Sequence, residues 1–267
     1  MQNSVNLYID VHCHLTGDEY DAVGGVNQTV RRAVECGVGR MICSGFDLQS
    51  SLQAKDLAEK HEEVYFCVGF HPSELSKYTD GDLERMENLC RHEKCVAVGE
   101  IGLDYHFDDN PPKDVQRQMF FAQMQLADRL GLPIVVHSRD AAADTLEFLQ
   151  TNAHLLKKGG LMHCYSYSAE MLSAFCDLGL YVSFGGPCTF KNAAKVQECV
   201  RCVPAHRLLT ETDCPYLAPV PLRGTFPNQP QNVTHIARQI SAIREQNEQE
   251  LKEQVMNNAK RLFFKMK

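Results

Sequence analysis

The sequence predicts an α/β fold, built as a single-domain (β/α)8 barrel, on three observations. Eight short apolar, β-branched runs recur along the chain, and segments with helical periodicity lie between most of them. No linker divides the 267 residues, a length that is common among barrels of this kind. Because strands and helices alternate eight times, a closed parallel barrel is favoured over an open doubly wound sheet. We therefore expect one domain over residues 1–267.

Apolar runs and helical periodicity in the sequence predict the positions of the strands and helices. The strands are LYIDVHCH, RMICSGF, VYFCVGFH, VAVGEIGLDY, PIVVHS, LMHCYS, YVSFGG and RLLTETDCP. The clearest helix is DVQRQMFFAQMQLADRLGLP, whose expected buried face consists of Val115, Met119, Ala122, Leu126 and Leu130. Gly131 and Pro133 should end this helix. Further helices are expected at about 50–61, 82–92, 140–152 and 169–178, with two or more between 232 and 264.

Composition and charge narrow the class of protein. The chain has no apolar run near the ~20 residues that span a bilayer, and its N-terminus lacks the pattern of a secretory signal. We therefore expect an intracellular protein of the cytoplasm or nucleus, with no membrane partner and no obligate protein partner. A net charge of −7 argues against a broad basic surface for nucleic acid. An anionic substrate would then have to be attracted by local groups or metal ions.

The cysteines indicate a reducing cellular compartment and no metal-binding or catalytic role. Twelve are scattered from Cys13 to Cys214, mostly in apolar runs, as is typical of buried free thiols in a reducing environment. Cys199 and Cys202 form a CxxC pair without a second pair at zinc-finger spacing, so we interpret them as packing residues on a helix. The sequence also lacks the glycine-rich motifs that cradle phosphates, and no nucleotide cofactor is expected.

Six polar side chains fall at the carboxyl ends of predicted strands, where barrel enzymes carry out their chemistry. They are His12, His14, Glu100, His137, His163 and Asp213. The first two share a face of their strand with Asp10, because residues two apart in a strand point the same way. Taken singly, such a histidine is more often a hydrogen-bonded structural residue, and such a carboxylate more often a helix cap. Four imidazoles and two carboxylates together predict a divalent-metal site.

The predicted ligands suffice for two ions. We assign His12, His14 and Asp213 to one ion and His137 and His163 to the other, with Glu100 bridging. Mixed imidazole and carboxylate ligands suit Zn²⁺ or Mn²⁺ better than Mg²⁺, and the metal's identity stays open among these three. Two ions about 3.5–4 Å apart can activate a bridging water, with Asp213 as general base and Glu100 as the other catalytic carboxylate. Asp10 is expected to support the ligands from behind or to bind weakly.

Several motifs together resemble one known family. The chain contains, in order, DVHCHL, GFHPSEL, GEIGLDY, VQRQMFFAQMQLADRLGLPIVVHSRDA, HCYS and TETDCPYL. With the final NAKRLF they resemble the TatD-type deoxyribonucleases of the amidohydrolase superfamily over nearly the whole chain. The resemblance implies an amidohydrolase-like barrel and a metal-dependent phosphodiesterase with DNA as its substrate. It further implies 3′-to-5′ exonuclease action, cleavage at abasic sites, and metal ligands at the six residues named above.

The substrate side carries weaker predictions. His71 matches a family histidine near the site, and we expect it and Arg139 to contact substrate phosphate. Arg223 could contact the DNA backbone, although a plain surface arginine is the simpler interpretation. Tyr105 and Tyr167 could stack on bases, although tyrosine at a strand end is more often a packing residue.

Two departures from the family pattern also bear on substrate. Ser73 and Glu74 follow the proline of GFHPSEL, where the family often has a second histidine, and this puts details of phosphate handling in doubt. Tyr167 replaces a glycine that is usual after HCYS, and it could narrow the mouth of the barrel.

Two other classes of protein remain open at this stage. A C–N or ester hydrolase of the same superfamily, acting on a small substrate, would share the fold and much of the site. Many such enzymes bridge their metals with a carbamylated lysine after the fourth strand, where this chain has Glu100. A non-enzymatic metal-binding or nucleic-acid-binding module would be expected to close a four-ligand metal shell or to show a basic stripe. Six ligands and an acidic chain fit neither expectation well.

Overall fold

The computed structural model describes residues 7–267, and their strands form one parallel sheet in which neighbours follow the order of the sequence. The strands are β1 (Tyr8–Cys13), β2 (Val38–Ser44), β3 (Val64–Val68), β4 (Cys95–Asp104), β5 (Ile134–Arg139), β6 (Gly160–Met162), β7 (Leu180–Phe184) and β8 (Leu208–Thr210). The Thr210 hydroxyl donates to the Ile9 carbonyl at 2.8 Å, and the Asp213 amide donates to the His12 carbonyl at 3.0 Å. These bonds join the two ends of the sheet, so the predicted (β/α)8 barrel is confirmed.

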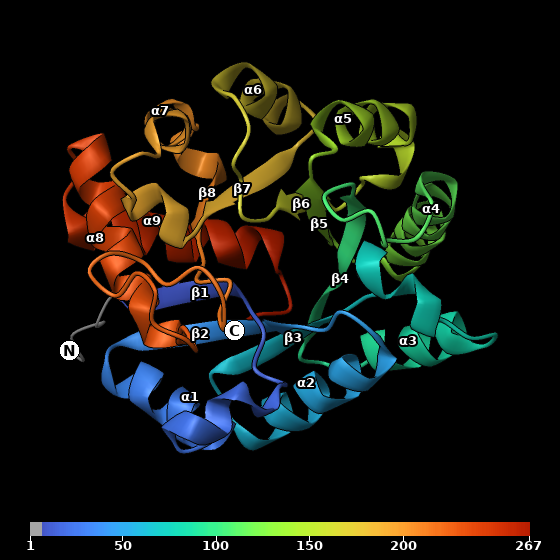
Figure 1. Cartoon of the computed structure of the whole chain (residues 1–267), viewed down its shortest axis with the longest axis horizontal. Helices are drawn as coiled ribbons and strands as arrows, with labels where there is room; N and C mark the ends of the chain where they lie inside the picture. Colours follow the sequence, from blue (N-terminus) through green and yellow to red (C-terminus); the bar gives the residue numbers. More distant parts are fainter. Residues whose placement is uncertain (1–6) are drawn as a thin grey trace.

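Helices surround the strands (Figure 1). The α-helices are α1 (Val26–Glu35), α2 (Leu48–Lys60), α3 (Asp82–Cys90), α4 (Lys113–Leu130), α5 (Ala142–Thr151), α6 (Ala169–Asp177), α7 (Ala194–Cys202), α8 (Val233–Arg244) and α9 (Glu248–Leu262). The 3-10 helices are η1 (Asp18–Val23), η2 (Pro72–Lys77), η3 (Ala153–Leu155), η4 (Gly186–Thr189), η5 (Ala205–Arg207) and η6 (Pro230–Asn232). The expected helices lie within a few residues of these bounds, and the segment 232–264 divides into α8 and α9 as expected.

The longest helix, α4, ends as the sequence predicts, but its buried face differs. Gly131 caps it in the left-handed conformation with φ of 64°, which glycine adopts without steric cost. Val115, expected in the buried face, is 39 % exposed. The face that packs on the barrel contains Phe120, Met124 and Ala127 together with two glutamines. The prediction for Val115 was wrong because these buried polar residues break the apolar pattern.

Two buried glutamines of α4, Gln116 and Gln123, fix the backbone near the barrel mouth. The Gln116 side chain accepts from the Asp104 amide at 2.8 Å and donates to the Asp104 carbonyl at 2.9 Å. Gln123 does the same for Phe70, at 2.7 and 3.1 Å. Both glutamines are buried, and a buried amide that satisfies two backbone groups is costly to lose. Helix α4 therefore sets the end of β4 and the residue that precedes His71.

Three predicted site residues lie elsewhere along their strands than expected. Glu100 lies within β4, not at its end, because β4 continues to Asp104 past a register shift between Val98 and Ile101. β8 ends at Thr210, so Asp213 lies three residues beyond it, with φ of 53°. His163 directly follows β6. The expected order of the strands still brings all three to the same pole of the barrel.

The cysteines are packing residues in this fold. All twelve are free thiols, and nine of them are buried. Cys199 and Cys202 both belong to α7, as expected for the CxxC pair, with Cys199 buried and Cys202 exposed. Thiols that pack in the core in this way behave as small apolar side chains.

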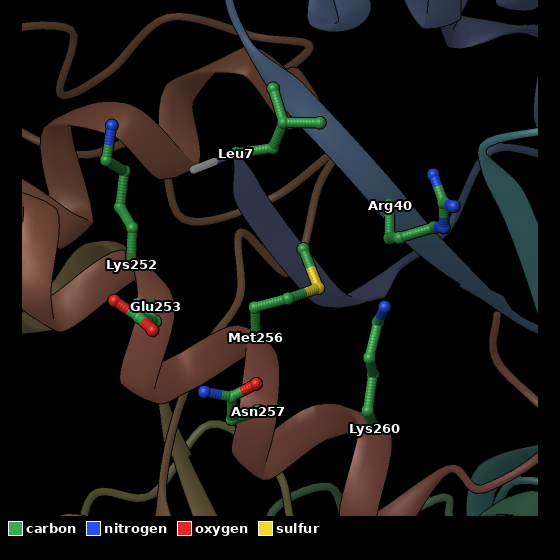
Figure 2. A pocket seen from close by; sticks show the side chains of 7 residues that line it. All are labelled: Leu7, Arg40, Lys252, Glu253, Met256, Asn257 and Lys260. Atoms are coloured by element: carbon green, nitrogen blue, oxygen red, sulfur yellow. The ribbon is translucent and has the colours of Figure 1, made fainter. Parts of the chain in front are cut away.

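On the side of the barrel opposite the predicted site, a groove of about 270 Å³ lies beside α9 (Figure 2). Leu7 and Arg40 line it from the amino-terminal ends of β1 and β2, and Lys252, Met256 and Lys260 line it from α9. Since the predicted site residues follow the carboxyl ends of the strands, this groove belongs to the other pole. Among residues 7–267, the structure contains no helix with the length and apolarity that a bilayer span requires.

Candidate metal centre

The side chains of all six predicted metal ligands meet at the carboxyl pole, and His71 lies among them. β1 ends in the HxH pair, with His12 on the strand and His14 just past it. His71 follows β3 as the N-cap of η2, and His137 belongs to β5. Residues from distant parts of the chain therefore share one site because parallel strands all end at the same rim of a barrel.

Glu100 lies at the centre, and its two carboxylate oxygens face different groups. Oε2 lies 3.2 Å from His12 Nε2 and 3.4 Å from His14 Nε2. Oε1 lies 2.8 Å from both His137 Nδ1 and His163 Nε2, and 3.5 Å from His71 Nε2. The carboxylate thus divides the cluster into two parts. We call them the Oε2 half, consisting of His12, His14 and Asp213, and the Oε1 half, consisting of His71, His137 and His163.

Asp213 completes the Oε2 half. Its Oδ1 lies 3.5 Å from His14 Nε2 and 3.8 Å from His12 Nε2. The Asp213 amide bonds to the His12 carbonyl, and the His14 amide bonds to the Cys214 carbonyl at 2.7 Å. These two backbone bonds hold the segment after β8 directly against the end of β1. The separation of Asp213 from the HxH pair is therefore fixed by the backbone.

Ser44, the last residue of β2, orients both imidazoles of the Oε2 half. Its hydroxyl lies 3.1 Å from His12 Nδ1, and its carbonyl accepts from His14 Nδ1 at 3.0 Å. A carbonyl can only accept, so His14 carries its proton on Nδ1. The Nε2 lone pair of His14 is then available toward the centre, which is the arrangement of a metal-binding histidine.

Two buried carboxylates have the corresponding role in the Oε1 half. Asp104 Oδ2 lies 3.0 Å from His137 Nε2. Glu211 Oε1 lies 3.7 Å from His163 Nδ1, while its other oxygen accepts from the Ser183 hydroxyl at 2.5 Å. Carboxylates behind imidazoles fix the tautomer and make the ligand nitrogen more basic. Asp104 therefore orients His137 so that Nδ1 faces Glu100, whereas Glu211 lies beyond hydrogen-bond distance of His163 and contributes only its charge.

His71 differs from the other four histidines in the way it is held. The Ser73 amide donates to His71 Nδ1 at 3.1 Å, so the lone pair of this nitrogen is already used. In the neutral ring the proton is then on Nε2, which faces Glu100 Oε1. Burial and the neighbouring His137 lower the pKa of His71 to about 3. His71 therefore presents an N–H donor to the site, whereas His14 and His137 use their outer nitrogens on Ser44 and Asp104 and can offer the inner nitrogen to a metal ion once it is deprotonated.

The charges of the cluster balance around Glu100. Burial alone would raise the pKa of this carboxyl, but His163, His12 and other imidazoles hold it well below its usual value. Burial alone would lower the pKa of His14, but the hydrogen bond to Asp213 and the charge of Glu100 raise it to about 9. Without metal, the carboxylates of this site are therefore paired with protonated imidazole.

The residues present fit divalent metal ions. Imidazole nitrogens face each other at short range, with 3.2 Å between His12 Nε2 and His14 Nε2 and 3.1 Å between His137 Nδ1 and His163 Nε2. Such groups repel one another unless a proton or a cation lies between them. Three groups of three ligand atoms lie within 4.8 Å of each other in this cluster. Imidazole and carboxylate donors are the ligands that Zn²⁺, Mn²⁺ and related ions take in proteins.

Asp10 lies behind this cluster, as expected. It is fully buried, and its carboxylate accepts from the Thr212 amide at 2.9 Å and from the Thr212 hydroxyl at 2.5 Å. These bonds hold the residue that precedes Asp213. Asp10 thus positions the end of the β8 segment.

Arg139 and the two predicted stacking tyrosines lie at the rim. The Arg139 guanidinium packs 5.1 Å from the centre of the Phe107 ring, and its contact with phosphate stays a prediction. The Tyr105 ring is covered by the Lys113 ammonium at 3.9 Å. The hydroxyl of Tyr167 lies 2.9 Å from the Ser138 hydroxyl, and its ring packs against the core. Both tyrosines are therefore held by protein contacts, which fits the packing interpretation.

The structure adds Ser44, Asp104 and Glu211 to the predicted site. Two of them had a signal in the sequence, because Asp104 lies four residues after Glu100 and Glu211 lies two residues before Asp213. Even spacing along an extended chain places residues on the same face. Ser44 had no such signal, since it acts across the β1–β2 pair and partly through its backbone.

A parallel barrel with imidazoles and carboxylates around a central glutamate at its carboxyl pole is the arrangement of a metal-dependent hydrolase. Comparison with known families agrees with this class. The model of the TatD related DNase family matches residues 9–264, and the chain belongs to this family.

Individual relatives cover almost the full length. The chain is 40% identical over 257 residues to an uncharacterized metal-dependent hydrolase, YabD, of Bacillus subtilis, covering 96% of this chain and 99% of the relative. It is 34% identical over 262 residues to a 3′-5′ ssDNA/RNA exonuclease, TatD, of Edwardsiella piscicida, covering 96% and 98%. The crystal structure of the TatD homologue YJJV of Escherichia coli superimposes with a TM-score of 0.90 at 30% identity, covering 97% and 98%.

Proposed function

We propose that this chain is a divalent-metal-dependent deoxyribonuclease that removes nucleotides from the 3′ end of DNA, and that the Oε2 half and the Oε1 half would each hold one ion with Glu100 between them. The division of the Glu100 oxygens between the two halves carries this proposal, because each oxygen faces its own set of imidazole nitrogens. A family relative described as a 3′-5′ exonuclease supports the choice of substrate and direction. When bound, two divalent ions would supply Lewis acidity to activate water and to offset charge on the phosphate.

The residues of the Oε2 half are suited to hold one ion and to move a proton. His12 and His14 offer Nε2, with Ser44 behind both rings. Burial alone would raise the pKa of Asp213, but its hydrogen bond to His14 and the nearby imidazole charges hold it below the usual value. An ionised Asp213 carboxylate is thus available at neutral pH to accept the proton of the attacking water.

The residues of the Oε1 half are suited to hold the second ion and the substrate phosphate. His137 and His163 offer lone pairs backed by carboxylates. The N–H that His71 presents suits an acceptor, and a phosphate oxygen of the substrate is such a group. Ser73, which departs from the family pattern, sets this tautomer through its backbone amide. His71 is therefore assigned to substrate and not to metal.

The test is release of nucleotides from 3′-labelled single-stranded DNA with Mn²⁺ or Mg²⁺, compared with excess chelator. We expect metal-dependent release that Asp213→Asn reduces by about 10²–10³-fold, the usual loss when one preorganised electrostatic group is removed. Metal content per chain, measured in parallel by elemental mass spectrometry, should fall from about two ions in the wild type to about one in Asp213→Asn. The matched control is Asp109→Asn, an exposed carboxylate on the loop after β4, which should leave both values unchanged.

Other results would redirect the assignment. If the wild type holds two ions but leaves DNA intact, the nuclease proposal is wrong. A hydrolase of small ester or amide substrates would then be the next function to test, since fold and metal site are shared among many chemistries. If the wild type holds only one ion, the two-metal part of the proposal is wrong.

A further inference from the structure

The loop that follows Asp213 exposes an unusual amount of apolar surface. Nine large apolar side chains are exposed in the described part of the chain, and four of them belong to this loop. They are Tyr216, Leu217, Val220 and Phe226. The two aromatic rings are the most exposed, at 59 % and 62 %. Their centres lie 6.3 Å apart with the planes tilted by 39°.

This loop is held firmly by its backbone. Asn228 is fully buried, and its side-chain amide donates to the Thr212 carbonyl at 3.2 Å and to the Tyr216 carbonyl at 2.6 Å. The Val220 amide donates to the Thr189 hydroxyl at 2.8 Å. The aromatic side chains are thus presented to solvent by an ordered backbone. A rigid aromatic surface is well suited to binding because little conformational entropy is lost.

The loop is also continuous with the metal centre. The Tyr216 amide donates to the Asp213 carbonyl at 3.1 Å, so the aromatic pair begins one turn from a predicted metal ligand. Further along the same loop, the Arg223 guanidinium packs 4.2 Å from the centre of the Phe190 ring. One loop therefore offers a flat apolar surface next to Asp213 and, further along, a positioned cation. The loop can be followed in orange from β8 in Figure 1.

We propose that Tyr216 and Phe226 form a stacking surface for an unpaired nucleobase of the substrate strand, next to the nucleotide whose phosphodiester bond is cut. Every base has a flat π-face, so such stacking tolerates any sequence and favours single strands. This inference rests on the proposed nuclease function and deepens it by naming the residues that would contact an unpaired base. We call the two side chains the aromatic pair.

The aromatic pair suits the base better than the phosphate. Neither ring carries a charge that could pair with phosphate, whereas two exposed rings match the flat π-face of a base. Arg223 is an exposed residue of the same loop, and its guanidinium is available to the phosphate of the adjoining nucleotide.

The test compares Tyr216→Ala and Phe226→Ala with the wild type on single-stranded DNA. Stacking is worth a factor of about 5–150 in binding per base, and we expect KM to rise by that factor with kcat nearly unchanged, as for loss of uniform binding. Tyr216→Phe should keep the wild-type KM, because the ring and not the hydroxyl makes the contact. Phe264→Leu is the matched control, since Phe264 is 51 % exposed beside Lys158, at the amino end of β6.

A substrate series then identifies the base. An abasic analogue placed at successive positions of the strand should raise the wild-type KM at one position only. At that position it should have little further effect on Tyr216→Ala, because the partner of the base has already been removed. Unchanged KM in both alanine variants, or independent effects of variant and abasic site, would overturn the inference while leaving the nuclease function intact.

Binding separates this inference from the proposed function. Fluorescence anisotropy of a labelled oligodeoxythymidylate with the metal-free chain measures stacking without cleavage. If the wild type binds the oligonucleotide more tightly than Tyr216→Ala and Phe226→Ala and yet fails to cut DNA when metal is added, the nuclease proposal fails and the stacking surface stands. If the aromatic pair instead joins two copies of the chain, sedimentation will show dimers that the alanine variants lose, with DNA binding unchanged, and the inference is wrong.

Discussion

The two halves of the metal centre are built in different ways. The Oε2 half takes both imidazoles from one strand end, and a neutral serine, Ser44, orients them. The Oε1 half takes its three imidazoles from three different strands, and the buried carboxylates of Asp104 and Glu211 stand behind two of them. Carboxylates strengthen metal ligands more than hydroxyls do, because their charge raises the basicity of the ring. The comparison indicates that metal binding by the Oε1 half depends on the charges of Asp104 and Glu211, which lie behind the ligands.

The largest effect is expected from substitution of Glu100, the residue that both halves share. Glu100→Gln keeps the size of the side chain but lacks the negative charge that faces both sets of imidazoles. We expect phosphodiesterase activity to fall by more than about 10³-fold, and both metals to be lost on gel filtration. Elemental mass spectrometry measures the metal content, with Asp109→Asn as the control. If one ion per chain remains bound, Glu100 serves only one half and the bridging role is wrong.

Substitution of the groups that support the ligands should have a smaller effect on metal affinity, and one that differs between the two halves. Asp104→Asn and Glu211→Gln should each weaken metal binding by about 10–100-fold, the usual range for a partner behind a ligand. Ser44→Ala should weaken it by less than about tenfold, since the Ser44 carbonyl still orients His14. Competition with a chromophoric chelator gives the affinities. Equal losses in all three variants would show that the difference between the halves has no energetic consequence.

The smallest expected effect is the release of protons when metal binds. His14 has a pKa raised to about 9 in the metal-free chain, so it is protonated at neutral pH, and a metal ligand must be neutral. Filling the Oε2 half near neutral pH should therefore release at least about one proton, and metal affinity should rise with pH until about pH 9. Calorimetric titration in two buffers of different ionisation enthalpy counts the protons. Metal binding without proton release near neutral pH would contradict the raised pKa.

Much of the site could be predicted from the sequence because strands impose simple rules. The HxH spacing places His12 and His14 on one face, and apolar runs that end in polar residues identify the carboxyl rim. The order of strands and helices then gives the barrel, which brings Glu100, His137 and His163 together. Gly131 ends α4 as expected, because a left-handed cap is a local property of glycine.

Other features depend on contacts between distant segments, which no local pattern specifies. The glutamines Gln116 and Gln123 occupy the buried face of α4 because they bond to the backbone of β4 and of the segment after β3. Val115 is exposed for the same reason, although its spacing predicts burial. In such cases a long-range hydrogen bond overrides the hydrophobic period.

The sequence by itself determined the barrel, the pole that carries the site and the identity of the side chains that gather there. The tertiary structure alone decided which nitrogen each imidazole presents, since the tautomers depend on Ser44, Asp104 and the Ser73 amide. It also decided that both aromatic side chains of the loop after Asp213, Tyr216 and Phe226, are exposed to solvent. The physical reason is that residue type and spacing are local, whereas proton positions and exposure are set by groups that only folding brings within reach.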